Sequence, residues 1–328
     1  MGQTKKLSRR EFLHLAAMVG TGAIVAACGA QATEEPAGEP AEKEPVRIAF
    51  WSGASPSDPA GEAQYQIGED FNEEHRGEIS VDYVYTPTTG TTQLSEKLMT
   101  NIAAGTPPEA AYFDRFLVAT WGAEGALTDI TDLANAAGIT KDDYFDFAWT
   151  EATWRGKLYA LPFQTDDRAI YFNKDHLEEA GFPTDRESFP TSIEEFDAMA
   201  EEMTIKEGPR YVQLGFIPWL SAGRIYNYAL SFGADVFDPG GTELRLDDPA
   251  MIYAAEWMRT YAEKYGVEAV AGFAEGFGGE AQQEFTAGLV SMQYSGSWML
   301  NNHNRYNPDL TYDVVPMPYP EGGRVSTM

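Results

Sequence analysis

The strongest constraint on the fold is a succession of apolar runs and amphipathic stretches from Val46 onward. The apolar run "VRIAFWS" (46–52) is followed by "GEAQYQIGEDFNEEH" (61–75), which is amphipathic with helical spacing, and then by "ISVDYVYT" (79–86). Strand, helix and strand in this order form a βαβ unit, in which the two strands pair in parallel. The sequence therefore predicts an α/β fold.

A second round of the same pattern follows. "TTQLSEKLMTNIAAG" (91–105) predicts a helix, "PEAAYFD" (108–114) a strand, and "FLVATWGAEGALTDI" (116–130) a helix and a turn. A chain of 328 residues with 43% hydrophobic content exceeds one ordinary domain. We expect two lobes, a first over 46–165 and a second over 166–328.

The second lobe has its own helix and strand signals. Thr191 and Ser192 precede two glutamates, which is typical of a helix cap and first turn. The pattern predicts strands at 211–218 and 310–320, helices at 224–233 and 248–266, and a helix leading into a strand over 280–300. The chain stops at "GGRVSTM" without a closing element, so we expect that the C-terminal part is truncated.

The N-terminal 45 residues read as an export signal and a tether. "SRREFL" contains the paired Arg9 and Arg10 and resembles a twin-arginine signal, and "VAAC" resembles a lipobox ending at Cys28. We expect a signal peptide over 1–27, acylation of Cys28 and a disordered tether over 28–45, which is rich in Ala, Glu, Pro and Gly. The alternative is a buried N-terminal helix with a core cysteine.

Charge and composition exclude several classes of partner. The 51 acidic residues exceed the 23 basic residues, which gives a net charge of −28 and repels nucleic acid and anionic lipid. One cysteine allows no intramolecular disulfide and no thiolate cluster, and the four scattered histidines favour no metal site. We expect no metal and no cofactor.

Two short motifs place a carboxylate beside a guanidinium at the end of an expected strand. In "LPFQTDDRAIYFNKD" (161–175), Asp166 and Arg168 would share one face of a strand, since alternate residues point the same way. In "YFDRF" (112–116), Asp114 and Arg115 follow an apolar run. Such pairs can accept from and donate to vicinal hydroxyls. The alternatives are a salt-bridged surface loop for the first motif and a helix N-cap for the second.

Aromatic residues recur near the same expected strand ends. Their rings can stack on the C–H faces of sugars, whose hydroxyls need polar partners. Core packing is the alternative for each single ring. The residues concerned are Trp51, Trp219, Tyr226, Tyr228 and Trp298.

Enzymatic functions find little support in the sequence. G-x-S-x-G, P-loop and H-E-x-x-H motifs are all absent, so we expect no catalytic residues. A glycoside hydrolase needs two facing carboxylates, and adjacent Asp166 and Asp167 would diverge. Asp114 and Asp166 could still converge from separate loops, so a secreted carbohydrate-active hydrolase remains open.

Five segments together resemble the extracellular solute-binding proteins of ABC importers, in the maltose and glycerol-phosphate binding group. They are "KLMTNIAAGTPPEAAYFDRF", "GALTDI", "GKLYALPFQTDDRAIYFNKDHLEEAGF", "FTAGLVSMQYSGSW" and "YDVVPMPYPEGG". The resemblance implies a two-lobed, type II periplasmic-binding-protein (Venus flytrap) fold that closes over a solute. It also implies a permease partner, a monomer, and a location at the outer face of a bacterial cell membrane or in the periplasm.

The resemblance also implies residue roles. Asp114, Arg115 and Asp166 would hydrogen-bond a sugar, and Trp219 and Trp298 would stack on it. Two positions depart from the maltose-binding branch: Ala111 and Tyr112 replace a tryptophan, and Ile217 replaces an acidic residue. These departures argue against maltodextrin itself, and a non-sugar solute such as glycerol phosphate remains an alternative.

Overall fold

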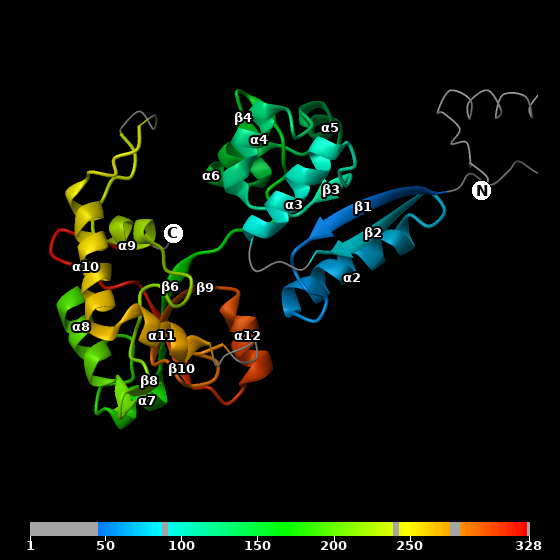
Figure 1. Cartoon of the computed structure of the whole chain (residues 1–328). Coiled ribbons are helices and arrows are strands. Elements are labelled where there is room, and N and C mark those ends of the chain that lie inside the picture. The colour runs from blue at the N-terminus through cyan, green and yellow to red at the C-terminus, as the bar shows by residue number, and fades with distance from the viewer. Residues whose placement is uncertain (1–44, 87–90, 239–242, 276–282, 327–328) are drawn as a thin grey trace, which may run out of the picture. The chain divides into compact units, whose positions relative to one another are not determined.

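The computed structural model describes residues 45–86, 91–238, 243–275 and 283–326, except for the side chains of 91–95. The predicted signal peptide, Cys28 and nearly all of the tether lie outside these ranges, so what the sequence indicates for them stays a prediction. Residues 46–328 form one unit. It contains two separate three-stranded sheets, each with its own surrounding helices (Figure 1).

The first sheet is parallel, as the βαβ pattern predicts. Its order is β2-β1-β3, and β1 pairs with β2 over its full length and with β3 at Phe50 and Trp51. Helix α2 runs along β1 and β2 (Figure 1). The elements are β1 (Val46–Ser52), α2 (Pro59–Glu74), β2 (Ile79–Tyr85), α3 (Thr91–Ala104) and β3 (Ala110–Ala111).

Short helices and one hairpin follow β3. The expected strand over 108–114 is wrong for most of its length, because pairing stops after Ala111 and Asp114 starts a 3₁₀ helix. The elements are η1 (Arg115–Leu117), α4 (Val118–Glu124), α5 (Thr131–Ala136), η2 (Lys141–Asp143), α6 (Asp146–Glu151), β4 (Thr153–Trp154) and β5 (Lys157–Leu158).

The second sheet is antiparallel, with the order β10-β6-β9. Its first strand, β6, starts at Arg168, so Asp166 precedes the strand instead of lying within it. The elements of this region are β6 (Arg168–Asn173), α7 (Lys174–Glu179), α8 (Ile193–Glu202), β7 (Ile205–Glu207), β8 (Arg210–Gln213), α9 (Ile225–Ser231), α10 (Pro249–Tyr265), α11 (Val267–Ala274), β9 (Met292–Gly296), α12 (Met299–Tyr306) and β10 (Tyr312–Val315).

Several local signals in the second region act as predicted. Ser192 caps α8 by accepting from the Glu195 amide at 3.3 Å, and Asp248 caps α10 from the Ala250 amide at 2.9 Å. The strand expected over 211–218 ends at Gln213, and residues 283–289 form turns where a helix was expected. The cap prediction at Ser192 is confirmed, and these two element predictions are wrong in their extent.

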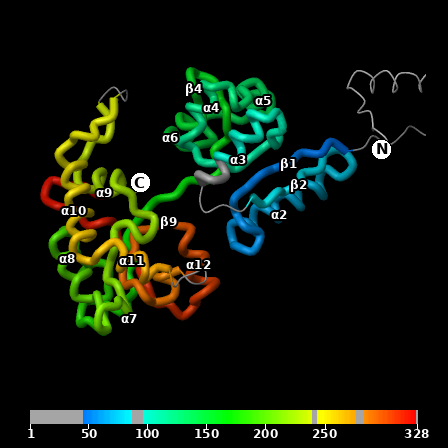
Figure 2. Tube along the Cα trace, in the orientation of Figure 1, coloured from blue at the N-terminus to red at the C-terminus, as the bar shows by residue number. Residues whose placement is uncertain are grey.

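The second region contains one large core and a separate small cluster of Tyr171, Phe285 and Met299. Helices α8, α9 and α10 pack around the large core, with α9 lying against α10 (Figure 2). Its largest fully buried side chains include Phe172, Phe196, Phe216, Tyr228 and Tyr294. Together with Phe189 and Trp257, these rings form a chain of contacts whose centroids lie 4.7–6.3 Å apart, which is typical of aromatic cores.

Candidate ligand-binding site

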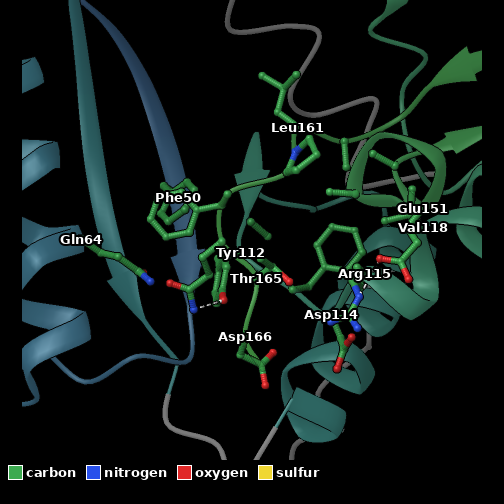
Figure 3. A pocket seen from close by; sticks show the side chains of 18 of the residues that line it. Phe50, Gln64, Tyr112, Asp114, Arg115, Val118, Glu151, Leu161, Thr165 and Asp166 are labelled. Carbon is green, nitrogen blue, oxygen red and sulfur yellow. Dashed lines mark hydrogen bonds and ion pairs between the residues drawn. The ribbon is translucent and has the colours of Figure 1, made fainter. Parts of the chain in front are cut away.

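Five of the predicted ligand-binding residues line a cavity of about 730 Å³. Figure 3 labels three of them, Asp114, Arg115 and Asp166. One wall comes from β1, α2 and β2, and the others from residues 111–118, α6 and the segment 160–168. Most of the lining is apolar, with a few polar groups, as in pockets that bind small organic solutes. The five residues are Asp114, Arg115, Asp166, Arg168 and Trp298.

Asp114 has a structural role that leaves part of its carboxylate available. Its Oδ1 accepts a hydrogen bond from the Phe116 amide at 3.3 Å, which caps η1. The N-cap interpretation of this motif is therefore confirmed. No described residue donates to Oδ2, and Figure 3 shows the Asp114 and Asp166 carboxylates directed toward the same side of the view. A carboxylate in this arrangement can accept from a solute hydroxyl.

Arg115 is held by a carboxylate that the sequence did not indicate. Its Nε lies 2.6 Å from Glu151 Oε2 at the end of α6, and both side chains are about one-third exposed. The two atoms are buried and their contact is an ion pair whose geometry is not that of a hydrogen bond. The guanidinium also lies 4.5 Å from the centre of the Phe116 ring. Arg115 is thus neutralised and oriented within the protein.

Asp166 and Arg168 contact each other, although Asp166 is outside the strand. Arg168 Nε lies 3.3 Å from Asp166 Oδ2, and Nη1 donates to the Ala222 carbonyl at 2.5 Å. The guanidinium carbon is 5.4 Å from the centre of the Trp298 ring, at cation–π distance. Trp298 itself is 41% exposed, so a large part of its ring is available for stacking.

Tyr112, which was noted in the sequence only as a departure from the maltose-binding branch, also lines the cavity. Its hydroxyl accepts from Gln164 Nε2 at 2.7 Å, and its ring meets Phe163 edge-on. Burial raises the pKa of Tyr112 above 10, the Gln164 hydrogen bond opposes this shift, and the charges of Asp114 and Asp166 add to it. The hydroxyl therefore stays protonated and keeps one proton to donate.

Sequence reasoning missed Tyr112, Gln164 and Glu151 for one reason. Glu151 ends α6, whereas Tyr112 and Gln164 lie in two loops far apart in the sequence, and only the tertiary fold brings the three to one cavity. The stretch "AAYFD" was the one local pattern that could have indicated Tyr112 as a site residue, and the same pattern also fits an ordinary buried strand. Nothing in the spacing of Arg115 and Glu151 connects the two residues before the fold is known.

The other three predicted residues do not line this cavity. Trp51 packs with Leu98 and Trp121 in a small core, and Lys97 Nζ lies 4.6 Å from the centre of its ring. Trp219 and Tyr226 are half-buried against the large core of the second region. Ligand contact by these three residues stays a prediction that this cavity does not support.

Tyr228 belongs to the core. It is completely buried, and its hydroxyl donates to the Pro218 carbonyl at 2.7 Å. Burial holds its pKa well above 10. The core-packing alternative is confirmed for this ring.

Neither a metal cluster nor a membrane-spanning helix occurs in the described part of the chain. Within those ranges, no three His, Cys, Asp or Glu side chains come together as metal ligands. The helices there are too short or too polar to cross a bilayer.

Comparisons with known proteins agree on one family. Residues 53–327 match the family model described as bacterial extracellular solute-binding protein. The maltodextrin-binding protein MdxE of Bacillus subtilis (strain 168) is 25% identical over 232 residues, which is 66% of this chain and 48% of MdxE. The sn-glycerol-3-phosphate-binding periplasmic protein UgpB of Rhizobium meliloti (strain 1021) is 23% identical over 212 residues, 61% of this chain and 46% of UgpB.

A solved structure supports the same assignment. CpMnBP1 with mannobiose bound is 28% identical, with a TM-score of 0.75, and the match covers 86% of this chain and 71% of that chain. This chain spans about half the length of the two sequence relatives. The fold is α/β and two-lobed, as in the sugar-binding proteins of this type. The chain belongs to the bacterial extracellular solute-binding protein family, whose members are binding proteins of ABC transporters.

Proposed function

We propose that this protein binds an uncharged sugar or oligosaccharide in the cavity and releases it chemically unchanged to the permease of an ABC importer. Export through residues 1–27, an acylated Cys28, a tether over 28–45 and a monomeric state complete the proposal. The lipid anchor would hold the binding protein near its permease at the outer face of the cell membrane. The lobe boundary near residue 165 is part of the same proposal.

One observation carries the choice of an uncharged ligand. Among the described residues that line the cavity, the two cations each have a carboxylate partner: Arg115 has Glu151 at 2.6 Å, and Arg168 has Asp166 at 3.3 Å. Asp114 adds one more negative charge. A phosphate ester would meet a net negative wall, whereas sugar hydroxyls can donate to these carboxylates.

The apolar groups of the cavity suit the same class of ligand. A sugar ring has C–H faces that stack on an exposed indole while its hydroxyls reach acceptors at the ring's edge. Trp298 supplies such a ring, and the Tyr112 hydroxyl supplies a donor beside the Asp114 and Asp166 carboxylates. Stacking and hydrogen bonding by these residues would hold a sugar without making or breaking a covalent bond.

Capture would work through a shift in a hinge equilibrium. A ligand that contacts residues of both lobes stabilises the closed form by the difference between its affinities for the two forms. Asp166 and Arg168 lie where the chain passes from the last elements of the first region into β6. A ligand at these residues would therefore act on the segment that joins the two sheets.

The test is calorimetric titration of the full-length chain with mannobiose, maltotriose and sn-glycerol 3-phosphate. We expect binding of at least one sugar and none of the phosphate ester. Asp114→Ala and Trp298→Ala should each weaken sugar binding by about 1–3 kcal/mol, through loss of a charge-assisted hydrogen bond and of a stacking surface. Asp132→Ala, an exposed aspartate on α5 outside the cavity, is the matched control.

A hydrolase is the competing function, and the same samples address it. Chromatography of each sugar after long incubation with the protein should recover it intact. Cleavage that disappears in both Asp114→Asn and Asp166→Asn would replace the binding proposal with hydrolysis. Preferential binding of the phosphate ester would contradict the argument from paired charges.

A further inference from the structure

The surroundings of Trp298 show why its ring has its present position. Gly296 lies two residues before it, at the end of β9, and faces Arg168 across the β6–β9 pair. A Cβ atom at Gly296 would lie 1.9–2.5 Å from three atoms of the Trp298 ring. The indole therefore rests directly on the Gly296 backbone, and any side chain at position 296 would displace it.

The Gly296 peptide is itself fixed. The buried Tyr171 hydroxyl donates to the Gly296 carbonyl at 2.8 Å, and burial raises the pKa of Tyr171 to about 12, so this donor is always protonated. The strand beneath the ring is thus held by a neutral hydrogen bond from β6.

Arg168 connects three separate segments at this place. Its guanidinium is shared among the Asp166 carboxylate, the Ala222 carbonyl and the face of the Trp298 ring. The planar group has five N–H donors in fixed directions, so it can satisfy two acceptors while its face lies toward an aromatic ring. A lysine ammonium has no such planar geometry.

The contact of Arg168 with the Ala222 carbonyl is to a loop that packs on the core. The Ala222 amide donates to the Tyr294 carbonyl at 3.2 Å, and the fully buried Tyr228 donates to Pro218 in the same loop at 2.7 Å. A Cβ at Gly223, the residue after Ala222, would collide with the Tyr228 hydroxyl at 1.9 Å, so the loop is packed tightly against the core. Arg168 therefore links the Asp166 carboxylate and the Trp298 ring to a loop that packs on the core.

We propose that Arg168 and Gly296 are positioning residues, which hold the Asp166 carboxylate and the Trp298 ring in the geometry that the ligand requires. Arg168 then acts through its two neighbours and not by touching the solute, which replaces its expected role as a ligand contact. The claim that these residues increase the affinity for the ligand rests on the proposed function. The claim that they hold the Trp298 ring in position does not. A ring that is already ordered loses less conformational entropy on binding, and this favours tight binding.

The experiment uses the full-length chain labelled with 5-fluorotryptophan. The chain has seven tryptophans, which give seven ¹⁹F resonances. The Trp298 signal is assigned from its absence in Trp298→Phe. Without any ligand, Arg168→Lys, Arg168→Met and Gly296→Ala should each shift or broaden this signal and leave the resonances of buried tryptophans such as Trp257 in place.

Two matched controls separate this effect from general destabilisation. Arg155 lies 5.2 Å from the Trp154 ring, outside the cavity lining, so Arg155→Met should move the Trp154 signal and not that of Trp298. Gly272 has open space around its Cβ position, so Gly272→Ala should move neither. If Arg168→Met does not fold, Arg168→Lys and Gly296→Ala decide the question.

Titration with mannobiose or maltotriose, whichever the unmodified protein binds, completes the test. Arg168→Lys and Gly296→Ala should each raise Kd about tenfold or more, while the two controls leave it unchanged. An unchanged Trp298 resonance in both variants would overturn the proposal. A shifted resonance with unchanged Kd would overturn the positioning role in binding, and absence of sugar binding by the unmodified protein would overturn the proposed function alone.

Discussion

The two sheet-containing regions differ sharply in how they are packed. Among the described residues, 170–317 contain one core of 28 buried side chains and a separate cluster of three, whereas 98–158 contain two small clusters with two and three buried members. Most of the residues that line the cavity belong to the first region, where the buried clusters are small. Among the described lining residues, only Arg168 and Trp298 come from β6 and the turn after β9. The comparison indicates that one region holds most of the described buried core while the other supplies most of the cavity wall.

The largest expected effect is truncation of a ring in the large core. Phe216 is 1% exposed and contacts Phe196, Trp257 and Tyr261, so Phe216→Ala should lower the free energy of unfolding by about 3–5 kcal/mol. Phe113→Ala in the small cluster around Trp121 should cost clearly less, because Phe113 is only partly buried. Urea unfolding followed by circular dichroism measures both.

Phe145→Ala is the control for these two variants. The Phe145 ring is 69% exposed, so its loss should change the unfolding free energy by about 0.5 kcal/mol or less. Equal losses for Phe113→Ala and Phe216→Ala would break the comparison between the two regions.

The second prediction concerns two titratable groups in the well-packed region, the buried His303 and the partly buried Asp197. His303 is completely buried, with Thr286 Oγ1 3.0 Å from its Nδ1, and burial lowers its pKa from 6.5 to about 4. Asp197 on α8 accepts from Trp257 at 3.0 Å and from Tyr261 at 2.6 Å, yet burial raises its pKa from 3.8 to about 6. The nearby charges of Glu194 and Lys264 change the Asp197 pKa less.

These two shifts act on stability with opposite signs. The folded state binds the His303 proton more weakly than the unfolded chain does, so stability from His303 is present above pH 6.5 and is lost as pH falls toward 4. The folded state binds the Asp197 proton more tightly, so stability from Asp197 is present below pH 3.8 and is lost as pH rises toward 6. Each effect amounts to about 3 kcal/mol over its range.

Between pH 4 and 6, the contributions of His303 and Asp197 to the unfolding free energy should therefore nearly cancel in the unmodified protein. Relative to the unmodified protein, Asp197→Asn should make the unfolding free energy rise more steeply with pH over this interval, and His303→Gln should make it rise less or fall. The slope is informative even if either variant is destabilised at every pH. Identical slopes in the two variants would contradict the assignment of these groups.

The smallest expected effect lies in the loosely packed region. Tyr112→Phe removes a hydroxyl that accepts from Gln164 and faces the cavity, so it should weaken sugar binding by about 0.5–1.5 kcal/mol. Stability should change little, since the ring and its contact with Phe163 are retained. Calorimetric titration compares it with Tyr85→Phe, an exposed tyrosine at the end of β2. If Tyr85→Phe weakened sugar binding more than Tyr112→Phe does, the assignment of Tyr112 to the binding site would be contradicted.

The parts of the fold that could be predicted from the sequence depend on local signals. The apolar run at 46–52 and the cap at Ser192 specify β1 and the start of α8 from neighbouring residues alone. The strand expected at 108–114 failed because its apolar composition fits a short strand followed by a capped 3₁₀ helix equally well. Local composition does not determine where pairing partners end.

The candidate site was only partly predictable for a related reason. The contact of Asp166 with Arg168 follows from their separation by one residue, and the structure keeps it even though Asp166 precedes the strand. The contact of Arg115 with Glu151 spans 36 positions, and the one between the Trp298 ring and Gly296 depends on a close backbone approach. Such contacts exist only after the elements have packed.

Binding of an uncharged sugar is the claim on which the functional account depends, and one titration tests it directly. Full-length protein is titrated with mannobiose and with sn-glycerol 3-phosphate at the same ionic strength, and the heats are compared with those of Trp298→Ala. The account predicts saturable binding of the sugar that weakens in Trp298→Ala, with no binding of the phosphate ester. Tight binding of the phosphate ester together with no response to the sugar would contradict it.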